Sequence, residues 1–360
     1  MKKKRVLITG GSGFIGSNFI RYALQKANFK GQIINLDKMT YAANPLSLED
    51  IERKYAGKHY FFEKIDICDY QKLEKIFRKY EPHIVVHFAA ESHVDRSIYG
   101  PKDFVKTNIE GTFNLLEICR KFWGKSRDKR FHHISTDEVF GSLGSRGKFK
   151  ESTPYNPRSP YSASKASSDH LVRAYFHTYG LPVTISNCSN NYGPRQYPEK
   201  LVPLIILNAI EGKNLPVYGD GKNVRDWLYV EDHCAAIYFV LKKGRVGVTY
   251  NIGANCEMRN IDLVKKLCSV LESEYPSSRN PKMKEGGYKN LIRFVKDRPG
   301  HDRRYAMDFT KMRRELNWKP SYSLDAGLRS TVRWYLDNPR WIARAKNRNY
   351  SLWIKAHYEE

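Results

Sequence analysis

Short apolar runs alternate along the chain with longer stretches in which apolar and charged residues recur at helical spacing. The first run, Val6-Leu7-Ile8-Thr9, stops at a group of glycines. A continuous apolar run of this length is typical of a strand buried on both faces. By the same criterion we predict strands at residues 6–9, 33–36, 84–88, 131–135, 183–187 and 249–252. The helical spacing predicts helices at residues 14–27, 70–80, 108–122, 160–179, 201–211, 231–243 and 261–272.

The alternation of strands and helices predicts the fold class. Strand–helix–strand units form a parallel sheet with helices on both faces. We therefore predict an α/β protein with a Rossmann-type doubly wound parallel sheet and a smaller α/β C-terminal lobe that binds the substrate. The predicted domains are residues 1–190, to which strands near 224–252 return, residues 191–341, and a basic tail at 342–360. Residues 275–290 are predicted to form a flexible surface loop.

The composition excludes several classes of protein. Of the 360 residues 41% are hydrophobic, so the net charge of +24 does not keep the chain from folding. No apolar run approaches the roughly 18 residues of a membrane-spanning helix, and no cleavage site follows the basic start, so we expect a cytoplasmic protein. The six cysteines form no Cys-x-x-Cys pair, which favours reduced thiols. The positive charges are spread along the chain without a nucleic-acid-binding motif, so we expect no nucleic-acid partner.

A glycine-rich loop follows the first predicted strand. In Thr9-Gly10-Gly11-Ser12-Gly13-Phe14-Ile15-Gly16 the glycines permit a tight turn and a close approach of the backbone to a pyrophosphate at the helix N-terminus. Asp37 ends the second strand 21 residues after Gly16 (37 − 16), close to the spacing of about 20 expected for an acid that binds ribose. Its carboxylate suits the ribose hydroxyls of NAD and would repel the 2′-phosphate of NADP. We therefore predict that the cofactor is NAD.

Two further groups of residues indicate redox and acid–base chemistry. Thr136, Asp137 and Glu138 follow the predicted strand 131–135, at the edge of a parallel sheet where ligands bind. Two neighbouring carboxyl groups in different surroundings can divide the roles of acid and base. Tyr161 and Lys165 stand at i and i+4 on a predicted helix, and an ammonium favours the phenolate. We therefore predict a tyrosine base that works nearer neutral pH.

Several further segments stand beside these motifs. They lie at 35–41 (NLDKMTY), 89–97 (AAESHVDRS), 136–138 (TDE), 159–166 (SPYSASKA), 187–194 (NCSNNYGP), 198–201 (PEKL), 223–227 (NVRDW) and 297–303 (DRPGHDR). With them the chain resembles the dTDP-glucose 4,6-dehydratases, a family of extended short-chain dehydrogenase/reductases within the NAD-dependent nucleotide-sugar epimerases and dehydratases. The resemblance spans roughly residues 5–341.

The resemblance implies an activity and a role for each catalytic side chain. The implied reaction converts dTDP-glucose to dTDP-4-keto-6-deoxyglucose and water, in deoxysugar biosynthesis of the rhamnose type, and regenerates NAD in each turnover. Tyr161 would take the hydroxyl proton of sugar carbon 4 while hydride passes to NAD, helped by Lys165 and Thr136. Glu138 would then remove the hydrogen of carbon 5 and Asp137 would protonate the departing hydroxyl of carbon 6. The hydride would return to carbon 6.

The resemblance also implies binding residues and an assembly. With the glycine loop, it places around NAD the residues Gly10, Gly13, Phe14, Ile15, Gly16, Asp37, Lys38, Met39, Thr40, Asp66, Ile67, Phe88, Ala89, Ala90, Glu91, Thr107, Tyr161, Lys165 and Asn191. Around the nucleotide sugar it places Ser92, Thr136, Asn190, Lys200, Leu201, Pro216, Val217, Tyr218, Arg225, Asn260, Asp297, Arg298 and His301. It implies a homodimer, formed as a helix bundle through the predicted helices 108–122 and 160–179.

Other functions stay open at this point. A UDP-glucose 4,6-dehydratase would show the same motifs. A nucleotide-sugar 4-epimerase would share the glycine loop and the Tyr-Lys pair, but it would not need Asp137 and Glu138 for the loss of water. A non-catalytic NAD-sensing or RNA-binding protein is favoured only by the charge. We expect no metal, because His83 and His87 bracket a predicted strand and so lack the helical spacing of a zinc motif.

Overall fold

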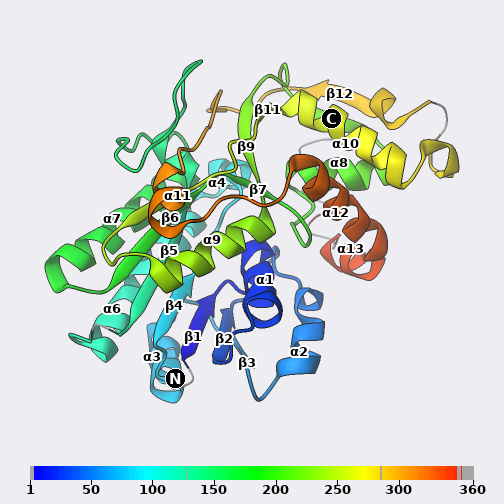
Figure 1. Ribbon diagram of the computed structural model, residues 1–360. Coiled ribbons are helices and arrows are strands. Elements are labelled where there is room, and N and C mark those ends of the chain that lie inside the picture. Colours follow the sequence, from blue (N-terminus) through cyan, green and yellow to red (C-terminus); the bar gives the residue numbers. More distant parts are fainter. Residues whose placement is uncertain (1–3, 127, 284–285, 347–349, 351–360) are drawn as a thin grey trace.

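The computed structural model describes residues 4–126, 128–283, 286–346 and 350. Its centre is a seven-stranded parallel sheet with the strand order β10-β6-β5-β4-β1-β2-β3 (Figure 1). The strands are β1 (Arg5–Thr9), β2 (Gln32–Asp37), β3 (Tyr60–Lys64), β4 (Ile84–His87), β5 (Arg130–Thr136), β6 (Val183–Cys188) and β10 (Thr249–Ile252). All six predicted strands belong to this sheet, and the predicted fold class is confirmed. Strand β3, which the sequence analysis missed, is one of the two edge strands and is only partly buried.

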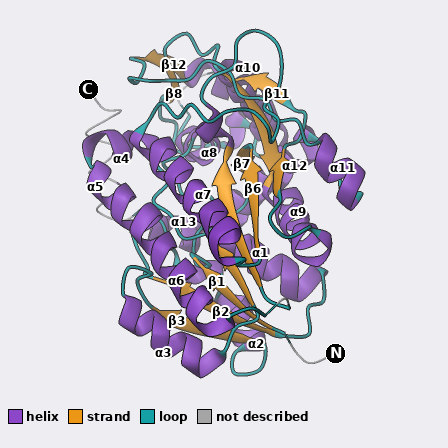
Figure 2. Cartoon of the chain, turned by 90° about the vertical axis from the view of Figure 1, so that its left-hand side faces the viewer, coloured by secondary structure: helices purple, strands orange, loops and turns teal. Residues whose placement is uncertain are grey.

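The two faces of the sheet are covered by different helices. Alternate side chains of a strand point to opposite faces, and in β1 Leu7 packs with one cluster while Val6 and Ile8 pack with another. The cluster around Leu7 includes residues of α3 (Tyr70–Tyr80), α6 (Gly111–Trp123) and α7 (Pro160–Tyr179). The other cluster includes residues of α1 (Phe14–Arg21), α2 (Glu49–Tyr55) and α9 (Val230–Lys243). Figure 2 shows α6 and α7 side by side in front of the sheet.

The predicted helices of this domain are present with local departures from α-helical geometry. The predicted helix 14–27 is α1 followed by a π-helical turn at Tyr22–Lys26. The predicted helix 108–122 corresponds to α6, which is preceded by α4 (Val94–Tyr99), α5 (Pro101–Phe104) and a π-helical turn at Val105–Glu110. Helices α2, α4 and α5 were not predicted, because they are too short to show a clear period.

A smaller lobe lies above the carboxyl ends of the central strands. Its core joins α8 (Leu201–Ile210), α10 (Asn260–Glu274), α12 (Leu324–Asp337) and α13 (Pro339–Ala345) with the paired strands β8 (Leu215–Tyr218) and β12 (Ile292–Val295). In Figure 1, α8 and α10 lie beneath β12, and α12 and α13 lie below them. A second sheet contains β7 (Asn190–Tyr192), β9 (Val224–Tyr229) and β11 (Glu257–Arg259). Helix α11 (Thr310–Leu316) packs near β10.

The chain crosses between the two parts more often than a single boundary suggests. Of the strands predicted near 224–252 to return to the first domain, β10 joins the central sheet, whereas β9 pairs with β7 and β11 in the smaller sheet. Helix α9, between them, packs on the central sheet. The division at residue 190 therefore stays a prediction.

Two predicted irregular segments differ from expectation. The predicted flexible loop 275–290 contains helical turns at Ser277–Arg279 and Tyr288–Leu291, and residues 284–285 lie outside the described residues. Asn280 is buried and its amide donates to the carbonyl of Ile210 at 3.0 Å, so this segment is anchored to the end of α8. The tail predicted at 342–360 begins inside α13, and most of it lies outside the described residues.

Candidate active site

The glycine loop between β1 and α1 is shaped by close backbone contacts. Gly10 has a φ of +69°, and a Cβ atom there would lie 2.7 Å from the backbone of Ala89. A Cβ atom at Gly16 would lie 2.3 Å from the carbonyl oxygen of Gly10. Only glycine allows β1, α1 and the end of β4 to approach so closely. The N-terminal end of α1 lines the adjoining cavity, where its positive dipole end fits the pyrophosphate of a dinucleotide.

Asp37 is buried at the end of β2, beside this loop. Its Oδ2 accepts a hydrogen bond from the Ser12 N–H at 2.9 Å, and its Oδ1 accepts one from the Met39 N–H at 2.8 Å. Burial raises the pKa of Asp37, while the two N–H donors act in the opposite direction. The neighbouring Lys38 ammonium is 2.8 Å from Asp66. The Asp37 carboxylate is thus held beside the glycine loop as an acceptor suited to sugar hydroxyls.

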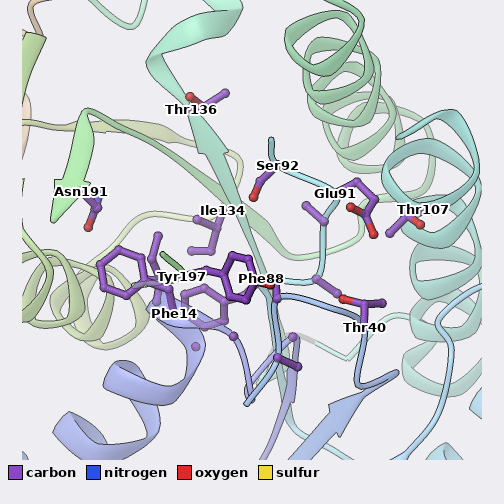
Figure 3. A pocket seen from close by; sticks show the side chains of 18 of the residues that line it. Phe14, Thr40, Phe88, Glu91, Ser92, Thr107, Ile134, Thr136, Asn191 and Tyr197 are labelled. Carbon is purple, nitrogen blue, oxygen red and sulfur yellow. The ribbon is translucent and has the colours of Figure 1, made fainter. Parts of the chain in front are cut away.

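A cavity of about 320 Å³ opens above the loop. Every predicted cofactor-binding residue lines it except Met39, whose backbone N–H donates to the Asp37 carboxylate. Figure 3 shows Phe14 and Phe88 in the middle of the lining and Thr136 at the end of β5. Ser92 also lines this first cavity.

A second cavity of about 170 Å³ adjoins the first. Most of the residues predicted to contact the nucleotide sugar line it, namely Asn190, Lys200, Leu201, Pro216, Val217, Tyr218, Arg225, Asn260, Arg298 and His301. Asp297 lines neither cavity and instead lies 2.6 Å from the Nδ1 atom of His301. The two cavities share Glu138, Asn190, Glu199 and Lys200 in their walls, so they form one continuous site.

The three residues after β5 stand at this junction. Thr136 caps the helical turn Asp137–Phe140: its hydroxyl accepts from the Glu138 N–H at 3.2 Å and donates to Asp137 Oδ1 at 3.3 Å. Asp137 Oδ2 is buried and has no hydrogen-bond partner among the described residues. The turn therefore presents two carboxyl groups to the same space.

The two carboxyl groups experience different surroundings. Burial raises the pKa of Asp137 well above its usual value, and the neighbouring Glu138 raises it further. Burial also raises the pKa of Glu138, but Arg298, Lys200 and Arg225 oppose that shift. Asp137 is thereby favoured as the protonated acid and Glu138 as the group more readily ionised.

Tyr161 and Lys165 project from the start of α7. The helix begins with Pro160 and a capping box between Ser159 and Ser162, which places both side chains towards the first cavity. The Lys165 ammonium donates to the Ile134 carbonyl at 2.8 Å, and burial lowers its pKa to about 8.

The predicted effect of Lys165 on Tyr161 is wrong for this structure. Burial raises the pKa of Tyr161 well above its usual value, and the negative charge of Glu138 adds to the increase. The hydroxyl of Thr136, which lines the same cavity, opposes this increase in the pKa of Tyr161. Burial, which a sequence spacing does not reveal, outweighs the expected influence of the ammonium.

A buried polar network behind the cavity holds Lys165, and sequence reasoning missed it. Asp169 Oδ2 accepts hydrogen bonds from the hydroxyls of Ser135 and Tyr155, each at 2.7 Å. Asp169 Oδ1 lies 3.2 Å from His133 Nε2, which is 3.4 Å from the Lys165 ammonium. Burial acts to raise the pKa of Asp169, yet His133 and its other partners hold it below the usual value. The signal was available, since Asp169 follows Lys165 by one helical turn.

Cations gather in the second cavity, and each is engaged. Arg298 donates to Asp95 Oδ1 at 2.8 Å, whereas Asp95 Oδ2 accepts from the Tyr218 hydroxyl at 3.3 Å. Arg225 donates to the carbonyl of residue 302 at 2.9 Å. The Lys200 ammonium donates to the Ser92 carbonyl at 3.0 Å. These groups give the cavity a fixed positive wall suited to a diphosphate.

Comparison with known proteins assigns the family. A family model described as GDP-mannose 4,6 dehydratase matches residues 7–331. The dTDP-glucose 4,6-dehydratase of Salmonella typhimurium is 51% identical over 369 residues, which cover 99% of this chain and 99% of the relative. The chain belongs to the dTDP-glucose 4,6-dehydratase family. The dTDP-glucose 4,6-dehydratase of Bacillus anthracis, solved in complex with NAD, matches this family member with a TM-score of 0.82 and 45% identity, covering 94% of this chain and 98% of the other.

The same fold extends beyond the dTDP-glucose 4,6-dehydratase family. A UDP-glucose 4-epimerase of Thermotoga maritima, solved with UDP-glucose, matches with a TM-score of 0.79 and 28% identity, covering 93% of this chain and 99% of the other. The fold alone therefore does not separate dehydratases from epimerases. The higher identity to dehydratases, together with the paired acids of the junction, does.

Some lining residues of this dehydratase family member were not predicted. Glu199 is the most buried charged group that both cavities share, and it accepts from Arg96 Nε at 3.1 Å. Its position next to Lys200, which was predicted to bind the sugar, was the one sequence signal that could have identified Glu199. The other lining residues missed around the first cavity include Ile134, Ser135, Cys188, Ser189, Gln196 and Tyr197.

Two features are absent from the described residues of this dehydratase family member. None of the helices described is both long and apolar enough to cross a membrane. Within residues 4–346, apart from the undescribed positions, no group of three or more His, Cys, Asp or Glu side chains could hold a metal ion. The cytoplasmic location stays a prediction.

Proposed function

We propose that the protein is a dTDP-glucose 4,6-dehydratase, which converts dTDP-glucose to dTDP-4-keto-6-deoxyglucose and water. One observation carries the proposal: Glu138 lines both cavities, and Thr136, Asp137 and Tyr161 lie beside it in the wall of the first. A sugar at this junction would meet a phenol, a hydroxyl and two carboxyl groups at once. An epimerase requires the phenol but has no step that uses the two acids.

The first cavity is the proposed site of NAD. The glycine loop and the N-terminus of α1 would hold its pyrophosphate, Asp37 its adenosine ribose, and the apolar lining its rings. When bound, NAD supplies a hydride acceptor for carbon 4 of the sugar and, in its reduced form, a hydride donor for carbon 6. The tight backbone contacts at Gly10 and Gly16 support this assignment, because they clear the space that a pyrophosphate needs.

The proton steps are assigned to the residues at the junction. Tyr161 accepts the hydroxyl proton of carbon 4 as a phenolate. The buried Lys165 ammonium in the same cavity wall and the positive charge of bound NAD would favour that phenolate against the burial that raises the pKa of Tyr161. The resulting ketone acidifies the hydrogen on carbon 5, which Glu138 removes as base. Asp137 protonates the hydroxyl that leaves carbon 6. The raised pKa of Asp137 supports its role as the acid, and the three cations facing Glu138 support its role as the base.

The second cavity is the proposed site of the nucleoside diphosphate. Arg225, Arg298 and Lys200 supply donors for its phosphate oxygens, and guanidinium groups bind phosphate with two parallel hydrogen bonds. UDP-glucose offers the same diphosphate and sugar, so the substrate experiment must include it.

A substrate panel tests the proposed function. Purified protein incubated with dTDP-glucose is expected to form a product that has lost one water, as measured by mass spectrometry. UDP-glucose is expected to react more slowly under the same conditions. If neither nucleotide sugar loses water while the protein retains NAD, the proposal is wrong.

A Glu138→Gln variant tests the assignment of the base. Oxidation at carbon 4 should continue while elimination stops, so the absorbance of reduced nicotinamide should accumulate in a single turnover. Product formation should fall by about a hundredfold or more, the usual size of a general-base contribution. The exposed Glu110→Gln variant serves as the control and should behave as the wild type. Wild-type product formation by Glu138→Gln would contradict the assignment.

We also propose that the protein forms a homodimer through α6 and α7. The two helices lie side by side at the surface (Figure 2). Val105 is 55% exposed, Phe113 is 43% exposed and Tyr179 is 52% exposed, so large apolar side chains stand on or next to these helices. A four-helix bundle between two copies would cover them. Light scattering should give the mass of a dimer for the wild type and of a monomer for Phe113→Asp; a monomeric wild type would exclude the dimer.

A further inference from the structure

Segment 40–47, which connects β2 to α2, belongs to two parts of the molecule at once. Thr40, Ala42 and Ala43 line the first cavity, and Figure 3 shows Thr40 among the residues of its wall. Tyr41, between them, packs instead against the core of the smaller lobe. The segment is therefore a wall of the first cavity whose outer side is covered by the lobe that contains most of the second cavity.

The first domain holds the end of this segment more firmly than its middle. The Ser47 carbonyl accepts a hydrogen bond from the Arg21 side chain of α1 at 2.6 Å. The Asn44 N–H donates to the Ser12 carbonyl of the glycine loop at 3.4 Å. Hydrogen bonds of this kind usually measure about 2.7 to 3.2 Å, so the second contact is long. The glycine loop therefore holds the middle of the segment only weakly.

Trp341 of α13 holds the segment at two points. Its indole N–H donates to the Ser47 hydroxyl at 2.9 Å, and its carbonyl accepts from the Asn44 side-chain amide at 3.1 Å. We call these two hydrogen bonds the clasp. Asn44, Ser47 and Trp341 are each at most 4% exposed. Opening the clasp would leave buried donors and acceptors without partners, which costs more than breaking a bond at the surface.

Trp341 is fixed in the core of the smaller lobe. Its ring meets those of Trp334 and Tyr335 nearly at right angles, with centroid distances of 5.1 and 6.2 Å. Both rings belong to α12, which packs on α8 and α10. Trp341 is thus held by the lobe and not by the segment. Any movement of segment 40–47 away from the first cavity must break the clasp.

We infer that Trp341 is a positioning residue for the cofactor: the clasp holds segment 40–47 against the first cavity and slows the release of NAD. This inference rests on the proposed NAD site. The proposed reaction requires retention of the cofactor, because the hydride taken from carbon 4 must stay on the protein until it returns to carbon 6. Trp341 is not among the described residues that line either cavity. It should therefore affect cofactor release without affecting the chemical steps.

Exchange of bound NAD tests the clasp with two substitutions that break one hydrogen bond from opposite sides. Trp341→Phe removes the indole N–H but keeps an aromatic ring, and Ser47→Ala removes the hydroxyl without altering α13. Holoenzyme is diluted into excess isotope-labelled NAD, and the unlabelled NAD still bound is followed by mass spectrometry. Each variant should exchange NAD about fivefold faster than the wild type, which corresponds to about 1 kcal/mol for one hydrogen bond. The double variant should exchange no faster than Trp341→Phe alone, because the same bond is lost only once.

Trp318→Phe is the matched control for Trp341→Phe. Trp318 is also buried, but it packs in another cluster, with residues of α11 and β10. Its substitution removes a buried indole without touching the clasp, so NAD should exchange at the wild-type rate. In excess NAD, all these variants should show the wild-type kcat. Equally fast exchange in Trp318→Phe would show a general loosening of the protein and would overturn the inference.

Ser47→Ala decides the outcome if Trp341→Phe does not fold, since it is the smaller change. Wild-type exchange in Ser47→Ala would overturn the inference. Rate increases that multiply in the double variant would do the same, because they would not come from one shared bond. A wild-type protein that retains no NAD would instead overturn the proposed cofactor site.

Discussion

The two cavities that meet at Glu138 are built by different means. The first is shaped by backbone at the carboxyl ends of β1, β2 and β4, where glycines allow contacts that no side chain would permit. The second is lined by charged side chains from separate segments, such as Arg225 on β9 and Arg298 after β12. The sheet itself fixes backbone positions, whereas buried charges require partners of their own. Ligand binding in the first cavity should therefore be most sensitive to substitutions that change its shape. Binding in the second should be most sensitive to substitutions that remove a partner charge.

The largest effect is expected from a side chain added to the backbone of the first cavity. Gly10→Ala places a Cβ atom 2.7 Å from the Ala89 backbone at a φ of +69°. The clash and the left-handed conformation together should cost about 2 to 5 kcal/mol. We expect purified Gly10→Ala to contain no NAD by mass spectrometry and to show no dehydration.

Gly180→Ala is the matched control for Gly10→Ala. Gly180 has a φ of +68°, but nothing lies within 4 Å of the Cβ position. This variant carries the backbone strain without the clash and should retain NAD and activity. Loss of NAD from both variants would show that global instability, and not the shape of the loop, explains the result.

This contrast also explains how much the sequence could predict. The first cavity depends on a continuous glycine loop and on Asp37 at the end of the next strand, so local spacing was sufficient to find it. The second cavity depends on pairs such as Arg298 and Asp95, which are 203 residues apart. No local pattern connects them, and only the family resemblance pointed to Arg298.

Burial was the property that sequence spacing could not supply. The spacing of Tyr161 and Lys165 correctly indicated one helix face, but burial reversed the expected shift in the pKa of Tyr161. For the same reason Asp169 passed unnoticed, although it continues the face that begins at Tyr161. A periodic pattern indicates which side chains share a helix face, but only the fold determines how deeply that face is buried.

The buried His133 behind the first cavity is expected to make the stability of the protein sensitive to acid. Burial, with smaller contributions from Lys165 and Arg173 and against the opposing effect of Asp169, lowers the pKa of His133 to about 4. The ring of His87 lies 5.2 Å from that of His133, centroid to centroid, at an angle of 43°. The unfolded chain therefore binds more protons than the folded protein between pH 6.5 and about 4. The contribution of His133 to stability is complete above pH 6.5 and is lost as the pH falls towards about 4, by at most about 3 kcal/mol.

Chemical denaturation at several pH values measures this loss. The free energy of unfolding should decline between pH 6.5 and 4, and His133→Gln should reduce the slope of that decline. The exposed His177→Gln variant should leave the slope unchanged. An unaltered slope in His133→Gln would mean that protonation of His133 does not cause the loss of stability in acid.

Asp169→Asn tests whether that wall also positions Lys165. The substitution keeps the size of the side chain but removes the charge that raises the pKa of Lys165. We expect kcat to fall by about a hundredfold, as for a lost acid–base contribution. The alkaline limb of the pH profile should move to lower pH, because Lys165 would lose its proton more easily. A lower kcat without this movement would indicate a purely structural role.

The smallest effect is expected from a partner charge of the second cavity. Asp95 holds Arg298 at 2.8 Å, while the Nε atom of Arg298 has no hydrogen-bond partner among the described residues. Arg298 lines the second cavity, so its guanidinium can bind a phosphate oxygen there while Asp95 still fixes its orientation. Asp95→Asn should raise KM for the nucleotide sugar by about tenfold, equal to about 1.4 kcal/mol, and leave kcat nearly unchanged.

The matched control for Asp95→Asn is an exposed pair in the same part of the molecule. Asp220 accepts from Arg303 at 3.0 Å with both side chains about half exposed, so Asp220→Asn should change KM by less than about twofold. A lower KM in Asp95→Asn would mean that Asp95 competes with the diphosphate for Arg298 instead of orienting it. The charges of the second cavity would then compete with its ligand, whereas in the first cavity the glycine backbone makes room for the ligand.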